Sequence, residues 1–224
     1  MADTPAPIWS RPERAATGRP PEHSRDEIAA AATVIADREG VEAVSMRRVA
    51  AELGTGAATL YRYVVSRDEL LDLMVDAAAS GYRFAPPTGD WVADLLDVAD
   101  QSRRIMRAHP WLPALTTRPL SPGPHGVALL EHAMAVLAGH PATASRKLSG
   151  FAVFNGAVAM LVRYELDDRP QDAARRGAYL RDAVAAGDRP HLAAVLAAAD
   201  PADSADRFHD VLRGILHGLL GVAG

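Results

Sequence analysis

The 224-residue chain contains no cysteine, so it forms no disulfide, binds no zinc through thiolates and uses no cysteine nucleophile. Its first 23 residues hold no apolar core segment of the kind that a secretory signal needs. No apolar run approaches the roughly 20 residues of a transmembrane helix. We therefore expect a cytoplasmic protein that does not enter a membrane.

The sequence also lacks the motifs of common enzymes and metal sites. It has no glycine-rich phosphate loop, no nucleophile elbow and no HExxH motif. His125 with His132, and His209 with His217, are each spaced to share a helix face, but no carboxylate pair joins them at ligand spacing. We expect no enzymatic activity, no cofactor and no bound metal.

Lysine is almost absent, because Lys147 is the only one and arginine carries the remaining positive charge. The net charge of −4 does not indicate a nucleic-acid binder, but the charge distribution does. Between residues 45 and 67, four arginines stand against a single glutamate. A local basic surface is expected where only one face of a protein meets phosphates.

Residues 45–67 have the pattern of two short helices joined by a glycine turn. Val49 and Leu53 are spaced to share one helix face, and Leu60–Val64 repeats this spacing. Gly54 follows the first helix, at a point where a left-handed backbone favours glycine. These features predict a helix-turn-helix.

The second of these helices presents Thr59, Tyr61, Arg62 and Tyr63 away from its apolar edge. Hydroxyl groups bond phosphate oxygens, and arginine can donate two hydrogen bonds to one guanine in the major groove. The alternative is an ordinary helical hairpin with solvated polar residues. Two exposed tyrosines beside an arginine favour DNA binding, because large aromatic side chains are seldom left exposed without use.

Three runs of this region, RRVAAELG, LYRYV and SRDELLDLM, resemble the TetR family of bacterial transcriptional repressors. In that family one helix precedes the motif and a linking helix follows it. SRDEIAAAATVIADREG and residues 67–81 occupy those places here. The resemblance is close over the first third of the chain. It implies an all-α fold, with an N-terminal three-helix DNA-binding domain followed by a helical ligand-binding and dimerisation domain.

We divide the chain accordingly into residues 1–23, 24–84 and 85–224. Residues 1–23 are rich in proline and lack an apolar period, so we predict a disordered arm. Gly18-Arg19-Pro20 resembles an AT-hook core that would enter the minor groove, although a solvated tail is the alternative. Capping boxes at Ser24–Glu27 and Ser66–Glu69 predict where the first helix and the linking helix begin.

The predicted DNA contacts fall into two groups. We assign base reading to Arg62, with small residues beside it close to the bases. The remaining residues contact phosphates or position the helix, and Ser45 either caps a helix or bonds a phosphate. The set is Ser45, Arg47, Gly56, Ala57, Ala58, Thr59, Tyr61, Arg62, Tyr63 and Arg67.

Beyond residue 84 the apolar pattern predicts helices over about 91–108, 126–139, 142–166, 172–186 and 203–220, with short ones at 111–115 and after 190. Those at 142–166 and 203–220 are apolar around more than one face, so they need partners on several sides. The resemblance implies a twofold homodimer through a four-helix bundle, and hence a pseudo-palindromic operator. The alternative is that both helices are simply intramolecular core.

The middle helices should enclose a site for a small-molecule effector. Apolar walls with a few polar groups are usual in such sites, although the same pattern also suits an ordinary core. An amide such as that of Asn155 must find a hydrogen bond there. The predicted ligand residues are Met106, Trp111, Leu115, Met134, Phe151, Asn155 and Tyr164.

Within the family, the second half resembles the tetracycline-repressor type through the helix starting at Trp91, the pair Arg103-Arg104 and the step Thr117-Arg118-Pro119. The histidine that this type uses for a magnesium–drug complex falls near Ala114, and its drug-reading asparagine falls near Val98. Both positions lack the required group, so we expect a different, mainly apolar ligand.

The sequence thus predicts a ligand-responsive DNA-binding repressor. A ligand that binds one conformation better would shift the linking helix and spoil the spacing of the two readers. Two alternatives stay open. One is a helical DNA-binding dimer with no ligand and a filled interior, and the other is a small-molecule-binding or enzymatic helical protein with an incidental helix-turn-helix. A cavity would discriminate between the first alternative and a ligand-responsive protein.

Overall fold

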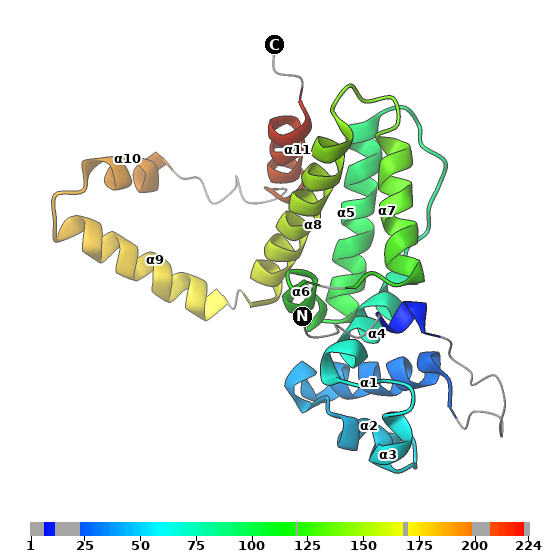
Figure 1. Cartoon of the computed structure of the whole chain (residues 1–224). Coiled ribbons are helices and arrows are strands. Elements are labelled where there is room, and N and C mark those ends of the chain that lie inside the picture. The colour runs from blue at the N-terminus through cyan, green and yellow to red at the C-terminus, as the bar shows by residue number, and fades with distance from the viewer. Residues whose placement is uncertain (1–6, 12–22, 120, 168–169, 199–206, 222–224) are drawn as a thin grey trace, which may run out of the picture.

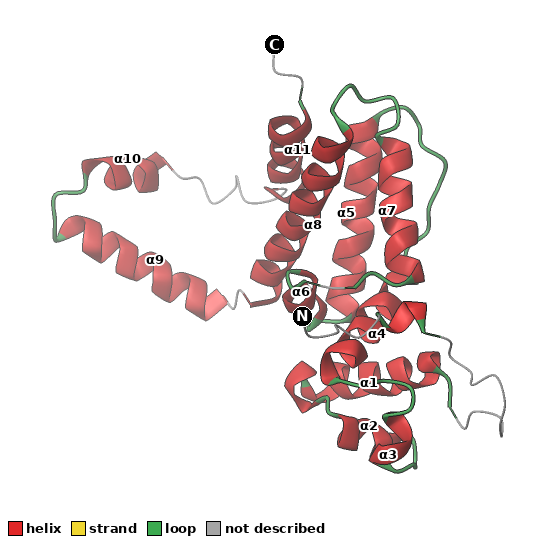
Figure 2. Ribbon diagram, viewed as in Figure 1, coloured by secondary structure: helices red, strands yellow, loops and turns green. Residues whose placement is uncertain are grey.

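The computed structural model describes residues 7–11, 23–119, 121–167, 170–198 and 207–221, and every regular element in these ranges is helical (Figures 1 and 2). The predicted all-α class is confirmed. None of these helices is long and apolar enough to cross a membrane. The elements are η1 (Ile8–Ser10), α1 (Arg25–Glu39), η2 (Val41–Ala43), α2 (Met46–Glu52), α3 (Ala57–Leu60), α4 (Arg67–Ala79), α5 (Trp91–Ala108), α6 (Leu112–Thr116), α7 (Pro124–Val136), α8 (Ala144–Asp167), α9 (Pro170–Ala185), α10 (Pro190–Ala198) and α11 (Arg207–Leu220).

Serine caps set the starts of α1 and α4. The Ser24 hydroxyl accepts the Glu27 amide at 3.1 Å, and Glu27 accepts the Ser24 amide at 2.8 Å, which completes the predicted capping box. Ser66 caps α4 in the same way, at 3.2 Å from the Glu69 amide. The Glu69 carboxylate, however, accepts the amide of Val65 at 2.9 Å, one residue further back than a capping box requires.

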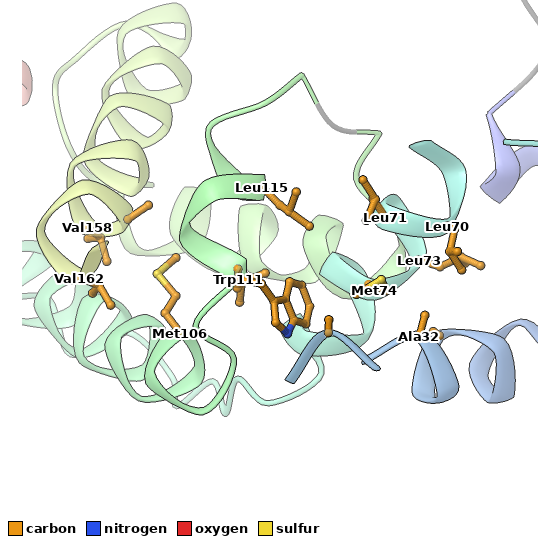
Figure 3. Packing of buried hydrophobic residues seen from close by; sticks show 14 of the residues in the cluster. Ala32, Leu70, Leu71, Leu73, Met74, Met106, Trp111, Leu115, Val158 and Val162 are labelled. Carbon is orange, nitrogen blue, oxygen red and sulfur yellow. The ribbon is translucent and has the colours of Figure 1, made fainter. Parts of the chain in front are cut away.

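The N-terminal unit, α1 to α4, is built around fully buried aliphatic side chains, and its core is continuous with that of the second half. Trp111 and Leu115, around α6, lie between Val158 and Val162 of α8 and the leucines of α4 (Figure 3). Because α4 belongs to both units, its position couples them. The buried residues of the N-terminal unit include Ile28, Ile35, Val49, Leu60, Val64, Leu70 and Met74.

The prediction of a disordered arm over residues 1–23 is wrong for residues 7–11. Ile8 is 1% exposed within η1, and the Trp9 indole N–H donates to the Ser121 carbonyl at 2.9 Å. Two large apolar side chains gain enough by burial to order a short turn that its proline-rich surroundings conceal. Residues 12–22, with the AT-hook-like Gly18-Arg19-Pro20, lie outside the described residues.

In the second half, α5, α7, α8 and α11 run side by side as a bundle, and α6 closes its end near α4 (Figure 1). α9 and α10 contact each other and stand away from this bundle in Figure 1. Neither contributes a buried side chain among the described residues. The bundle is therefore the part of the second half that can enclose a ligand.

Candidate functional site

The turn between α2 and α3 has the geometry that the sequence predicts. Gly54 adopts φ +69°, in the left-handed region that disfavours a Cβ. The Thr55 amide bonds the Ala50 carbonyl at 2.9 Å, which closes the turn. Gly56 then takes an extended backbone and precedes α3. The turn thereby sets the angle at which α3 leaves α2.

The face of α3 opposite the core points to solvent. Leu60 and Val64 are fully buried, whereas Tyr61 is 53% exposed and Arg62 is exposed. Regular helix ends at Leu60, but the amides of Arg62 to Val64 continue to bond the carbonyls of Thr59 and Leu60. We call residues 57–64 the reading segment. Its exposed face covers about two turns, and the major groove of B-DNA admits an α-helix.

The other small and hydroxyl residues of the reading segment lie around this face. Ala58 is exposed, and Ala57 and Thr59 are half-buried. Tyr63 is also half-buried, and its hydroxyl accepts the His23 amide at 3.4 Å. Tyr63 therefore ties the reading segment to the start of α1, a role that the sequence did not suggest.

The arginines of the N-terminal unit differ in what they already bond. Arg47 and Arg62 are exposed and have no hydrogen-bond or ion-pair partner within the described chain. Arg48 instead pairs with Glu39 at 2.7 Å, and hydrogen bonds from Arg48 and Arg38 lower the pKa of the Glu39 carboxyl. Within the described chain, Arg47 and Arg62 are therefore two arginines of the helix-turn-helix that no protein group already binds. The predicted cap at Ser45 is present, because its hydroxyl accepts the Arg48 amide at 3.3 Å.

Arg67 has partners that its predicted phosphate contact did not anticipate. Its Nε donates to the Val44 carbonyl at 3.0 Å, and its Nη2 donates to the Val41 carbonyl at 2.9 Å. Nη2 also lies 3.4 Å from the Glu42 carboxylate. Arg67 thus fastens the start of α4 to the link between α1 and α2, and any phosphate contact would be additional to this role.

A cavity of about 360 Å³, partly open to solvent, lies between α4, α5, α6, α8 and the start of α7. Its walls are mainly apolar, with a few polar groups from α4 and from the segment between α6 and α7. The lining residues are Asp72, Val75, Asp76, Ala79, Tyr82, Ile105, Met106, Leu112, Thr116, Arg118, Ser121, Pro122, Gly123, Gly126, Leu129, Phe151, Ala152 and Asn155.

Three of the seven predicted ligand residues, Met106, Phe151 and Asn155, line this cavity. Leu115 is core instead, and Met134 is partly buried against the core. The expectation that Tyr164 points inward is wrong, because it is 65% exposed. α8 is apolar on several faces, so one sequence does not reveal which face meets the cavity.

Trp111 does not line the cavity and instead bonds the second half to α1. Its indole N–H donates to the Asp37 carboxylate of α1 at 2.6 Å, and His109 lies 2.9 Å from the same carboxylate. Both residues precede α6, so Asp37 joins the end of the cavity to the N-terminal unit. No local sequence pattern indicates this pairing, since the partners are far apart along the chain.

Two carboxylates on α4 are lining residues that sequence reasoning missed. Asp76 is 6% exposed and accepts the amides of Gly126 at 2.8 Å and His125 at 3.3 Å, which caps the start of α7. Burial raises the pKa of Asp72, against opposing effects of the Ser121 backbone and Arg118. Their spacing was a usable signal, because residues four apart share a helix face, and here that face otherwise meets the core.

The cavity holds no arrangement that resembles a metal site. No group of three or more His, Asp or Glu side chains within the described ranges could hold a metal ion. Ala114 is exposed and Val98 is buried, and neither lines the cavity. Near the cavity, Tyr82 shares a 2.7 Å hydrogen bond with Ser102, and burial raises the pKa of its phenol.

Two family models match the chain. Residues 28–74 match the model described as bacterial regulatory proteins, tetR family. Residues 85–222 match that described as tetracyclin repressor-like, C-terminal domain. The two matches fall on the two units that the structure shows.

Similar proteins come from actinomycete genera. The chain is 37% identical to the HTH-type transcriptional repressor DrrR1 of Streptomyces coeruleorubidus over 75% of its own length, and this match spans only 63% of DrrR1. It is 33% identical to an HTH-type transcriptional regulator of Saccharopolyspora erythraea, over 98% of this chain and 92% of that protein.

Among solved structures, apo ActR from Streptomyces coelicolor superposes with a TM-score of 0.76 at 30% identity, covering 91% of this chain and 98% of ActR. ActR in complex with actinorhodin gives a TM-score of 0.75 at 29% identity, with 89% and 96% covered.

Proposed function

The chain belongs to the TetR family of bacterial regulators, and on that premise we propose a ligand-released repressor that binds a pseudo-palindromic operator as a homodimer. Its effector is a small, mainly apolar molecule that enters the cavity beside α4. The proposal assigns each unit one task, since the N-terminal unit reads DNA and the second half dimerises and binds the effector.

The cavity is the observation that carries this proposal. Its volume of about 360 Å³ falls in the range of small-molecule sites, at roughly 300–1,000 Å³. A DNA-binding dimer without a ligand would have a filled interior, so the cavity argues against that alternative. ActR has been crystallised with actinorhodin and with (S)-DNPA, which supports a ligand-responsive role for a chain of the same fold.

The lining predicts an amphipathic effector. Met106 and Phe151 offer an apolar wall, while the Asn155 amide is available for a hydrogen bond. Asp76 is already occupied as the cap of α7, so its position depends on α4 and α7 together. A molecule that separates these helices would therefore move α4, and with it the reading segment.

The α8–α11 surface supports the homodimer. On α11, Phe208, Leu212 and Leu216 face the core of the chain, whereas Val211 is exposed. α8 likewise leaves Val153 exposed. Exposed apolar side chains on two neighbouring helices are what a symmetric partner would cover. Dimerisation through it would set two reading segments about one DNA turn apart.

The direct test is selection of bound fragments from sheared genomic DNA with the purified full chain. We expect a short inverted repeat near a promoter, bound by two copies. Compounds are then screened for release of the protein from that fragment. Ligand binding without any preference for a duplex would instead favour the small-molecule-binding alternative, and a sequence-specific monomer would overturn the dimer.

A further inference from the structure

The N-terminal segment Pro7–Arg11 contacts the wall of the ligand cavity. The Trp9 indole N–H donates to the carbonyl of Ser121, a lining residue. The Trp9 ring also packs on Gly123, where an added Cβ would lie 2.5 Å from Trp9 Cζ2 and 2.4 Å from Asp76 Cγ. Gly123 must therefore lack a side chain for the tryptophan and the Asp76 cap to meet at this wall.

The other end of the same segment contacts the N-terminal unit. The Arg11 guanidinium forms an ion pair with the Glu69 carboxylate, whose side chain is 14% exposed. The Glu69 oxygen that bonds Arg11 also accepts the amide of Val65, the residue that follows the reading segment. In addition, the Arg11 carbonyl accepts a hydrogen bond from Arg25 of α1 at 3.1 Å.

A single turn joins these two ends. The Ser10 amide bonds the Pro7 carbonyl at 3.0 Å, and the Arg11 amide bonds the Ile8 carbonyl at 3.3 Å. Ile8 is buried and holds the turn in place. In Figure 1 the segment, drawn in blue, lies between the lower end of α7 and α1. Two backbone hydrogen bonds and one buried side chain thus join the contact with the cavity wall to the contact with Glu69.

From these contacts we infer that Pro7–Arg11 is a strap that couples the cavity wall to the end of the reading segment, in parallel with α4. Displacement of Ser121 and Gly123 would move Trp9, loosen Arg11 from Glu69 and release the Val65 amide. This role rests on the proposed function, because it makes the strap part of the ligand response. The competing interpretation is a static clasp, whose two ends act independently.

Hydrogen exchange resolved to single amides distinguishes the two interpretations in the full chain. Trp9→Phe keeps an aromatic ring but removes the indole donor to Ser121, and Arg11→Gln removes the ion pair. The Gly126 amide reports the cavity wall and the Val65 amide reports the reading segment. For a strap, each variant accelerates exchange at both amides by about three-fold or more. The acceleration in the double variant should be smaller than the product of the two single-variant accelerations, because both changes break the same connection.

Controls separate this coupling from general destabilisation. Trp91→Phe and Arg175→Gln, which alter a distant tryptophan and the exposed pair with Asp172, should leave both reporter amides unchanged. The amide of Val158, in the buried core of α8, should exchange equally in all variants if none unfolds globally. Acceleration confined to the nearer amide in each variant would overturn the strap.

The exchange experiment needs neither an operator nor a ligand. If the chain selects no DNA fragment, the proposed function fails while the exchange result still decides whether the strap couples its ends. Where an operator is found, Trp9→Phe and Arg11→Gln should change its dissociation constant in the same direction. Equal operator affinity in wild type and both variants, together with coupled exchange, would overturn the role of the strap in DNA binding.

Discussion

At the residue scale, the partners of an arginine within the fold determine whether its replacement affects stability, DNA binding or both. Arg67 holds two backbone carbonyls of the link before α2, so its loss disturbs the fold as well as any phosphate contact. Arg47 and Arg62 have no such partner in the part of the chain that the structure describes. Among these three arginines, Arg47 and Arg62 are therefore the ones whose removal should report a DNA contact and not a disturbed fold.

Arg62→Ala should relax base preference at one position of each half-site, at a cost of about 1–3 kcal/mol for the preferred base. The reason is that a guanidinium reads guanine by two hydrogen bonds, which alanine cannot replace. Arg47→Ala is the matched control and should weaken all sequences alike. Binding to a library of operator variants measures both effects, and an unchanged base preference for Arg62→Ala would remove it from the reading set.

Asp72 gives a pH-dependent prediction. Burial raises its pKa above the ordinary value of 3.8, so the folded chain holds this proton more tightly than the unfolded chain. Its contribution to stability therefore falls as pH rises from the unfolded pKa through the raised folded pKa. Asp72→Asn, which cannot ionise, should raise the free energy of unfolding at pH 7 by less than about 1 kcal/mol, because the group is partly exposed, and so raise the melting temperature slightly.

The gain from Asp72→Asn should disappear as the pH falls below about 3, where the wild-type carboxyl is protonated in both states. Asp188→Asn, at an exposed carboxylate, should shift the melting temperature at neither pH. Thermal unfolding across this range checks the sign. A variant that is less stable than wild type at pH 7 would show that the Asp72 charge is favourable in the fold.

The sequence predicts which side chains face the core where the apolar period allows only one inward face. Leu60 and Val64 had to face the core, so Tyr61 and Arg62 had to face outward. On α8 the same reasoning placed Asn155 correctly and Tyr164 wrongly, because a helix with several apolar faces has no unique inner face. Partners distant in sequence, such as Asp37 and Trp111, left no local signal.

At the scale of elements, the turn between α2 and α3 is the point where backbone geometry alone fixes the reading segment. Gly54 has positive φ and no atom within 4 Å of an added Cβ. Gly54→Ala should therefore cost about 1–2 kcal/mol from backbone strain only, or roughly 2–8 °C in melting temperature. Operator affinity should fall as well, because the strained turn re-aims α3.

Gly139→Ala is the control for this strain. It too has open space around an added Cβ, but its φ is not in the left-handed region. Thermal unfolding should distinguish the two variants clearly. Equal melting temperatures would mean that the turn relaxes freely, and that α3 is not held by the conformation of Gly54.

The ends of a helix can be predicted from the sequence where a capping residue or a proline stands at the edge of an amphipathic pattern. α5 occupies Trp91–Ala108 as expected, because the Asp90 side chain accepts the first free amides and Pro110 stops the helix. η1 was missed because two apolar residues in a proline-rich stretch carry no period. Its order depends on Ser121 and Gly123, which no local pattern connects to Trp9.

At the scale of the whole molecule, α4 and the strap both run from the cavity wall to the reading segment, whereas the homodimer that we propose pairs through α8 and α11. The proposed partner contact on α11 is therefore separate from the cavity, which no described residue of α11 lines. A change confined to the outer side of α11 should remove dimerisation while leaving the cavity and the N-terminal unit intact.

Gly214 provides that change. It lies within α11 with nothing within 4 Å of an added Cβ, so the isolated chain does not need glycine there. A glycine in a helix interior costs about 1 kcal/mol relative to alanine, which close approach of a partner helix would offset. Gly214→Leu should thus yield a folded monomer with unchanged helix content, and operator affinity should fall to that of a single half-site.

Gly177→Leu is the control, because Gly177 lies on α9 and an added Cβ would meet only the flexible end of Arg181. This variant should stay dimeric in sedimentation equilibrium. A Gly214→Leu protein that still sediments as a dimer would place the twofold axis away from this face of α11.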